Sequence, residues 1–133
     1  MTSPKGRILC TEDNEDTREL LILVLQKEGY EVVCVDNAEQ AITLAKSQSF
    51  DLFLVDSWLP NSSGAMLTKK IREFDDKTPI LFYSGAAFEA DKKEARNAGA
   101  QGYLVKPVEN EELVAEVINL IAQSKIVKPI RVV

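Results

Sequence analysis

The chain has 133 residues, which is the usual size of one compact domain and too few for two ordinary ones. Apolar residues make up 45% and charged residues 28%, a balance that allows a buried core and excludes the low-hydrophobicity class of disordered proteins. The 16 Lys and Arg residues against 21 Asp and Glu residues give a net charge of -5. We therefore expect neither direct nucleic-acid binding nor binding to an anionic membrane.

Histidine is absent, which excludes Ser-His-Asp catalysis and the common zinc sites within this chain. The two cysteines, Cys10 and Cys34, lie inside apolar runs, where small buried thiols are common, and we interpret them as core residues. No apolar stretch approaches the length of a membrane span or of a signal-peptide core. We therefore expect a cytoplasmic protein whose chemistry uses carboxylate, hydroxyl or amine groups.

Five short apolar runs lack strict polar alternation, which is typical of strands buried on both faces of a sheet. They cover residues 8–11, 32–35, 52–55, 80–83 and 103–105. A segment with helical spacing follows each run: residues 15–28, a segment opening with Asn37 and Gln40 in a capping-box arrangement, and residues 64–74, 88–98 and 110–123. Strict alternation predicts an α/β fold with a doubly wound, five-stranded parallel sheet, because right-handed crossovers place helices on both faces.

We expect residues 1–123 to form this one domain. The last stretch, residues 124–133, carries Lys125, Lys128 and Arg131 and no acidic residue. We interpret it as a C-terminal tail or the remnant of a linker.

Polar side chains follow four of the five predicted strands. They are Glu12 and Asp13 after the first, Asp56 after the third, Ser84 after the fourth and Lys106 after the fifth. Functional groups of open α/β sheets collect beyond the carboxyl ends of the strands. Any one of these residues has an ordinary explanation, such as capping a helix, but together they specify a site. Asp36, after the second strand, is interpreted as a structural acid.

Charge indicates what the site holds. Three carboxylates within roughly 4 Å of one another repel by about 4 kcal/mol per pair at an effective dielectric constant of about 20. A divalent cation relieves this repulsion, and oxygen ligands without His or Cys favour Mg²⁺, with Mn²⁺ as the alternative. Beside such an ion, Asp56 can act as a nucleophile and form an acyl phosphate. Lys106 and Ser84 would then neutralise and hydrogen-bond the phosphoryl oxygens.

Over about residues 6–123 the chain resembles the receiver domain of two-component response regulators. The matching motifs are Ile-Leu-Cys-Thr-Glu-Asp ending at Asp13, Asp-Ser-Trp-Leu-Pro beginning at Asp56 with Gly64 after it, Ser-Gly-Ala beginning at Ser84, and Gly-Tyr-Leu-Val-Lys-Pro ending at Pro107. The resemblance implies a flavodoxin-like (βα)5 fold with strand order 2-1-3-4-5. It also implies that Asp56 accepts a phosphoryl group from a sensor histidine kinase or a phosphotransfer protein, and that a downstream effector protein responds.

The same resemblance implies the metal ligands: Glu12, Asp13, Asp56 and the backbone carbonyl of Trp58. The family more often has two aspartates where this chain has Glu12-Asp13. Because glutamate is one methylene longer, we expect Asp13 to be the direct ligand and Glu12 to act through water.

The resemblance also implies a switch. Ser84 stands where the family often has Thr, and it keeps the hydroxyl that senses the phosphoryl group. Tyr103 matches the aromatic residue whose ring moves inward when that hydroxyl moves. The output surface is then expected on the fourth helix, fifth strand and fifth helix, and a homodimer, if one forms, on the same face.

Three forms of this function stay open. The chain could be a free-standing switch, the receiver of a longer regulator with an output domain, or a pseudo-receiver that binds proteins without phosphorylation. We do not expect an independent enzyme, because Trp58 stands where haloacid-dehalogenase phosphatases place a second Asp. Its catalysis would be limited to its own phosphorylation and dephosphorylation.

Overall fold

The computed structural model describes residues 4–126, so most of the predicted tail, residues 124–133, lies outside the described residues. Five parallel strands form one sheet in the order β2-β1-β3-β6-β7. These strands are β1 (Arg7–Thr11), β2 (Glu31–Val35), β3 (Leu52–Val55), β6 (Ile80–Ser84) and β7 (Gly102–Val105). Counted along the chain, this is the predicted 2-1-3-4-5 order, and the predicted fold class is confirmed.

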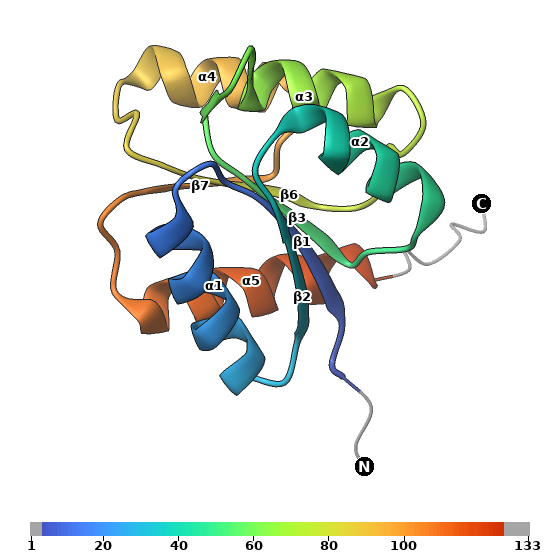
Figure 1. Cartoon of the computed structure of the whole chain (residues 1–133), viewed down its shortest axis with the longest axis vertical. Helices are drawn as coiled ribbons and strands as arrows, with labels where there is room; N and C mark the ends of the chain where they lie inside the picture. Colours follow the sequence, from blue (N-terminus) through green and yellow to red (C-terminus); the bar gives the residue numbers. More distant parts are fainter. Residues whose placement is uncertain (1–3, 127–133) are drawn as a thin grey trace, which may run out of the picture.

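Five helices cover the two faces of the sheet. They are α1 (Glu15–Lys27), α2 (Ala38–Ser47), α3 (Gly64–Arg72), α4 (Glu89–Ala98) and α5 (Asn110–Ser124). Figure 1 shows α1 and α5 on one face and α2, α3 and α4 on the other. None of the helices among residues 4–126 combines the length and apolar character that crossing a bilayer requires.

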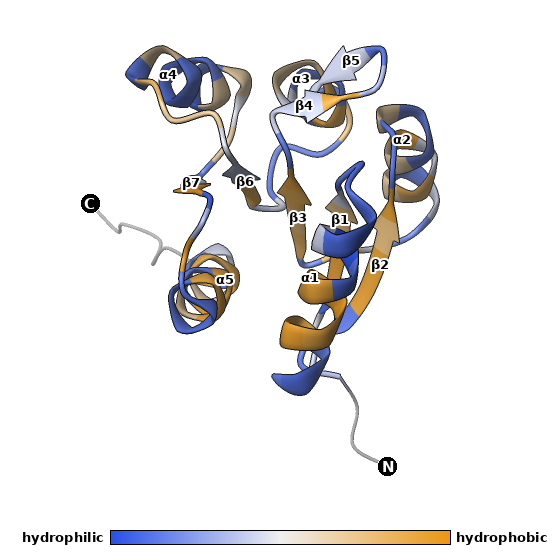
Figure 2. Cartoon of the chain, turned by 60° about the vertical axis from the view of Figure 1, so that its left-hand side comes forward, coloured by the Kyte–Doolittle hydropathy of each residue, from blue (hydrophilic) through white to orange (hydrophobic). Residues whose placement is uncertain are grey.

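The core consists of two hydrophobic clusters, one on each side of the sheet. Successive side chains of a strand point to opposite faces, so Ile8 and Cys10 pack with α1 and α5, whereas Leu9 packs with α2 and α3. Figure 2 shows β1, β2 and β3 coloured as largely hydrophobic. Burial on both faces explains why the predicted strands lack polar alternation.

Helix ends follow the sequence signals closely. The Asn37 side chain accepts a hydrogen bond from the backbone N–H of Gln40 at 2.9 Å, as the capping arrangement predicts. Gly99 ends α4 with a φ of 119°, a left-handed conformation that glycine adopts without a Cβ clash.

A short antiparallel hairpin was not predicted. It pairs β4 (Trp58–Leu59) with β5 (Ser62–Ser63) between β3 and α3. Strands of two residues are too short to give a periodic signal. The hairpin returns the chain to Gly64, whose N–H donates to the Ser57 carbonyl at 2.9 Å. A Cβ at Gly64 would collide with the Asp56 carbonyl oxygen and lie 2.8 Å from the Phe82 ring.

Candidate functional site

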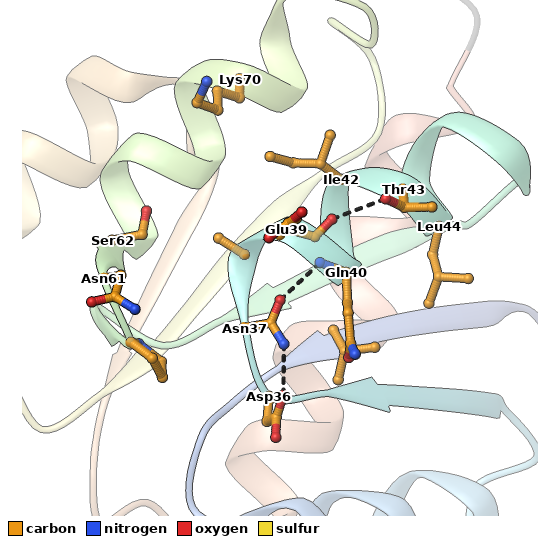
Figure 3. Close-up of a pocket in the computed structure, with 13 residues that line it drawn as sticks. Asp36, Asn37, Glu39, Gln40, Ile42, Thr43, Leu44, Asn61, Ser62 and Lys70 are labelled. Atoms are coloured by element: carbon orange, nitrogen blue, oxygen red, sulfur yellow. Dashed lines mark hydrogen bonds between the residues drawn. The ribbon is translucent and has the colours of Figure 1, made fainter.

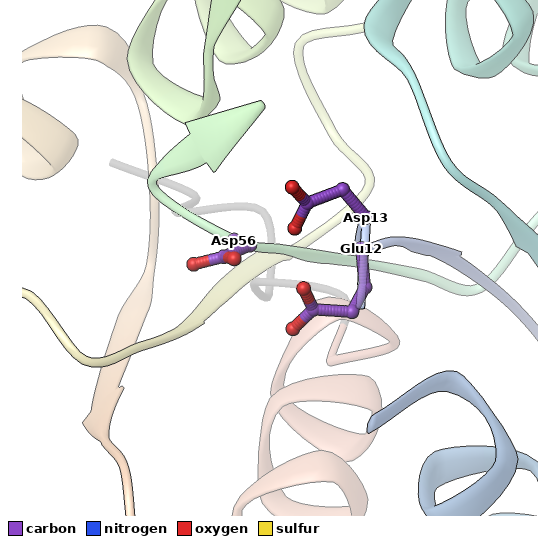
Figure 4. Close-up of side chains that lie close together, drawn as sticks. All are labelled: Glu12, Asp13 and Asp56. Carbon is purple, nitrogen blue, oxygen red and sulfur yellow. The ribbon is translucent and has the colours of Figure 1, made fainter. Parts of the chain in front are cut away.

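Three predicted acidic residues meet at the carboxyl end of the sheet. Glu12 and Asp13 follow β1, and Asp56 follows β3, the strand beside β1. The Asp56 N–H donates to the Thr11 carbonyl at 3.1 Å, which extends the pairing of β1 and β3 up to the site. One oxygen from each of the three carboxylates lies within 4.8 Å of the others (Figure 4). The predicted acidic cluster is therefore present.

The three acids differ in burial. Glu12 is 3% exposed and Asp56 is 6% exposed, whereas Asp13 is exposed to solvent. The Asp56 Oδ1 atom is buried and has no hydrogen-bond partner among residues 4–126. A buried carboxylate oxygen without a partner is destabilising unless a ligand or water binds it. A set of oxygen donors with one such atom fits a hard divalent cation.

Lys106 provides the positive charge of the site. Its Nζ lies 2.5 Å from Glu12 Oε1 and 3.9 Å from Asp56 Oδ2. The amine predicted to neutralise phosphoryl oxygens therefore has its shorter contact with Glu12 and its longer one with Asp56. The other Glu12 oxygen accepts the N–H of Asn14 at 3.2 Å. Both Glu12 oxygens thus accept a hydrogen bond within the protein.

Arg18, on α1, was not singled out by sequence reasoning. Its guanidinium donates to the Glu12 carbonyl oxygen at 2.9 Å, which fixes the backbone between β1 and α1. An arginine on an amphipathic helix gives no sequence signal that it bonds the backbone of Glu12.

The predicted switch residues lie on the β6 and β7 side of the site. Ser84 is fully buried, and its hydroxyl oxygen accepts the N–H of Ala86 at 3.1 Å. The Tyr103 hydroxyl donates to the Ala86 carbonyl at 2.6 Å and lies 3.2 Å from the Ser57 hydroxyl. The half-buried Tyr103 ring also stacks on Phe82 with the centroids 5.6 Å apart. The tyrosine hydroxyl is therefore bonded within the protein instead of pointing to solvent.

Ser57 is the second residue that sequence reasoning missed. It follows Asp56 directly, and its contact with Tyr103 joins the acidic side of the site to the switch side. The two residues are 46 positions apart, so no local pattern reveals their pairing.

Trp58 lies at the rim of the site with 63% of its surface exposed. A Cβ built on Gly85 would lie 3.5 Å from the Trp58 ring, so the indole covers the first residue after β6. A groove lies elsewhere, between the start of α2 and the hairpin, and Figure 3 shows Asn37, Asn61 and Lys70 along it. None of the predicted site residues lines this groove.

Comparison with known proteins identifies the family. The sequence profile of the response regulator receiver domain matches residues 8–118. The cell cycle response regulator CtrA of Brucella ovis is 34% identical over 119 residues, which cover 90% of this chain and 51% of that protein. The chain thus spans about half the length of the curated relatives it matches.

Two solved structures have the same fold over nearly their whole length. A putative response regulator from Chloroflexus aurantiacus has a TM-score of 0.85 and 33% identity over 90% of this chain and 99% of that one. The receiver domain of a sensor histidine kinase from Pseudomonas aeruginosa has a TM-score of 0.82 and 30% identity over 88% and 98% of the two chains. That receiver domain has a magnesium ion coordinated in its active-site cleft. The profile match and these relatives show that the chain belongs to the response regulator receiver domain family of two-component signalling.

Proposed function

We propose that the chain is a phosphorylation-dependent switch in which Asp56 accepts a phosphoryl group from a sensor histidine kinase or a phosphotransfer protein. The observation that carries this proposal is the buried Asp56 carboxylate, whose Oδ1 has no hydrogen-bond partner among the described residues. The nearby Lys106 amine supplies a charge that a phosphoryl group requires. A carboxylate held in this way is poised for a reaction partner and does not serve as a structural cap.

The acidic cluster is proposed to hold Mg²⁺, with Mn²⁺ as the alternative. Asp13, Asp56 and the Trp58 carbonyl are the proposed direct ligands, and Glu12 acts through water. A bound Mg²⁺ would offset the carboxylate charges and the developing charge of the phosphoryl oxygens. The magnesium ion in the related receiver domain from Pseudomonas aeruginosa supports this assignment.

The transfer step uses the chain's own groups in distinct roles. An Asp56 carboxylate oxygen attacks phosphorus, the bond from phosphorus to the donor nitrogen breaks, and the electron pair stays on that nitrogen. Lys106 moves from Glu12 toward the phosphoryl oxygens, a short shift because its Nζ is already 3.9 Å from Asp56 Oδ2. The Ser84 hydroxyl donates to a phosphoryl oxygen, and its oxygen moves away from the Ala86 N–H as it does so.

The output is proposed to run through Ala86 and Tyr103. When Ser84 releases the Ala86 N–H, the backbone that accepts the Tyr103 hydroxyl is free to shift. Two discrete arrangements of this loop and ring give a partner protein different surfaces to bind. The proposed output surface is α4, β7 and α5, and a homodimer would use the same face. The cytoplasm is the expected location.

The experiment is intact mass after incubation with acetyl phosphate and Mg²⁺. A gain of about 80 Da is expected for one acyl phosphate. Asp56→Asn should abolish the gain, and excess EDTA should suppress it. Asp36→Asn is the matched control, because Asp36 directly follows β2 at the same sheet edge yet is exposed and outside the cluster. Full labelling of Asp56→Asn, or of the wild type in EDTA, would contradict the proposal.

A receiver with an attached output module is the second form of the same function. The curated relatives favour it, since they are about twice as long as the matched region. In that form the same switch would control the attached module. A pseudo-receiver that is never phosphorylated gains no support from the site, because Asp13, Asp56, Ser84 and Lys106 all lie at the sheet edge.

A further inference from the structure

The two cysteines of the chain are neighbours across the sheet. Cys10 on β1 and Cys34 on β2 are register partners in a parallel pair, although 24 positions separate them. Both side chains point to the face covered by α1 and α5, where they belong to the same cluster. Paired residues of adjacent strands have Cα atoms about 5 Å apart. A disulfide accepts Cα separations of about 4.4–6.8 Å, so this pair meets the first requirement for a bond.

The two thiols differ in access and in chemistry. Cys10 is fully buried, whereas Cys34 is half-buried and lies on β2, the edge strand of the sheet. The neighbouring Cys10 thiol lowers the pKa of Cys34, and the charge of Arg18 acts in the same direction. Cys34 is therefore the nucleophile that a small oxidant can reach, and the buried Cys10 is the resolving cysteine.

We infer that Cys10 and Cys34 form a redox-modification site, in which a hydroperoxide converts the two thiols into a disulfide that joins β1 to β2. Cys34 sulfur attacks the peroxide oxygen, the O–O bond breaks, an alcohol or water leaves, and Cys34 becomes a sulfenic acid. Cys10 sulfur then attacks Cys34 sulfur, the S–O bond breaks, and water leaves with the Cys10 proton. The two thiols lose two electrons and two protons in total, and the hydroperoxide is reduced to an alcohol and water.

The position of this bond connects it to the acidic cluster. Val35, directly after Cys34, accepts the N–H of Glu12 at 3.0 Å, and Glu12 binds Lys106. A disulfide between Cys10 and Cys34, one register step before Val35, therefore constrains the backbone that carries Glu12. Cross-strand geometry in a regular sheet is not ideal for a disulfide, and strained disulfides are the readily reduced ones. A readily reversed bond suits regulation in a compartment where thiols are normally reduced.

The test uses the reduced 133-residue chain in EDTA, without any phosphodonor. Hydrogen peroxide is added, the reaction is quenched, the protein is unfolded, and the remaining thiols are alkylated before intact mass is measured. The wild type should become a monomer about 2 Da lighter with no alkylated thiol, and dithiothreitol should restore both thiols. Because no phosphoryl chemistry takes part, Asp56→Asn should behave as the wild type, so this test stands apart from that of the proposed function.

Single variants separate the two roles. Cys10→Ser should stop at a Cys34 sulfenic acid, about 16 Da heavier and trapped by dimedone. Cys34→Ser should leave the buried Cys10 reduced. The inference is overturned if wild-type thiols survive peroxide that oxidises glutathione in the same tube, if disulfides form between chains only, or if Cys10 oxidises as fast in Cys34→Ser as in the wild type. If either variant fails to fold, the wild-type result alone tests the inference.

Discussion

The carboxyl edge of the sheet has two halves that differ in how completely their polar atoms are bonded. On the β1 and β3 half, three acids gather, and the buried Asp56 Oδ1 has no hydrogen-bond partner within residues 4–126. On the β6 and β7 half, the Ser84 hydroxyl and the Tyr103 hydroxyl both have partners on the Ala86 backbone. Among the described residues, the first half thus leaves a buried acceptor without a donor, whereas the hydroxyls of the second half have partners.

This difference is what the proposed switch would use. The acidic half has three carboxylates and one amine, a negative charge that a metal cation can stabilise. The switch half is held by ordinary hydrogen bonds of modest net free energy, so a competing phosphoryl oxygen can break them. Lys106 and Ser57 connect the halves, because Lys106 contacts Glu12 and Ser57 contacts Tyr103.

The largest expected effect comes from filling the space between the halves. Gly64→Ala places a methyl group against the Asp56 carbonyl and 2.8 Å from Phe82, a core residue behind Tyr103. Overpacking of this kind costs about 3 kcal/mol in the free energy of unfolding, because backbone and ring must both move. Urea unfolding monitored by circular dichroism measures the change.

Gly85→Ala is the matched control at the same edge. Its Cβ would meet Trp58 at 3.5 Å, an ordinary contact, so we expect a change within about 0.5 kcal/mol. Equal losses in the two variants would show that Gly64 does not hold the halves together.

The second effect tests whether the acidic half lacks a ligand. Mg²⁺ at about ten times its dissociation constant should raise the free energy of unfolding by roughly 1.4 kcal/mol. Asp13→Asn should reduce this increment, whereas Asp36→Asn, outside the cluster, should keep it. Thermal melting at constant ionic strength measures both. A wild-type melting temperature that ignores millimolar Mg²⁺ would count against the metal site.

The third effect tests whether the switch half is complete without a ligand. Tyr103→Phe removes the hydrogen bond to the Ala86 carbonyl and should lower the free energy of unfolding by about 1 kcal/mol. The loss should be the same with and without Mg²⁺, since no metal is needed for this bond. Tyr83→Phe is the control, because Tyr83 lies on β6, next to β7, but packs on the face of the sheet opposite to Tyr103. If Tyr103→Phe lowered the free energy of unfolding only with Mg²⁺ present, the two halves would be coupled in the unphosphorylated protein.

Much of this arrangement could be predicted from local sequence signals. Uninterrupted apolar runs gave five parallel strands, and the residues directly after them, such as Asp56 and Ser84, had to meet at one edge. The missing parts are pairings between distant residues: Ser57 with Tyr103, Lys106 with Glu12, and Cys10 with Cys34. These depend on register and side-chain direction, which a single sequence does not encode in any local pattern. The β4–β5 hairpin was missed because two-residue strands have no period.

The smallest expected effect concerns the lifetime of the phosphoryl group and tests the outer rim of the acidic half. Trp58 lies two residues after Asp56, is exposed, and covers Gly85 with its ring. An indole has no acceptor to orient that water, and the buried Ala86 offers no polar side chain from the other half. We therefore expect a long-lived phosphoryl group, because hydrolysis needs a water aligned behind phosphorus.

The autodephosphorylation rate of the wild type, Trp58→Ala and Trp58→Asn at saturating Mg²⁺ separates two explanations of that lifetime. If the indole merely shields the site, Ala and Asn should accelerate hydrolysis equally. If orientation of the water matters, Asn should exceed Ala, because its amide can accept a hydrogen bond from the water. A several-fold change in this rate corresponds to about 1 kcal/mol or less in the activation free energy. A change of that size leaves the roles of Asp56 and the metal intact. Identical rates in all three proteins would show that Trp58 covers loop surface only, and that the rim takes no part in the chemistry of the acidic half.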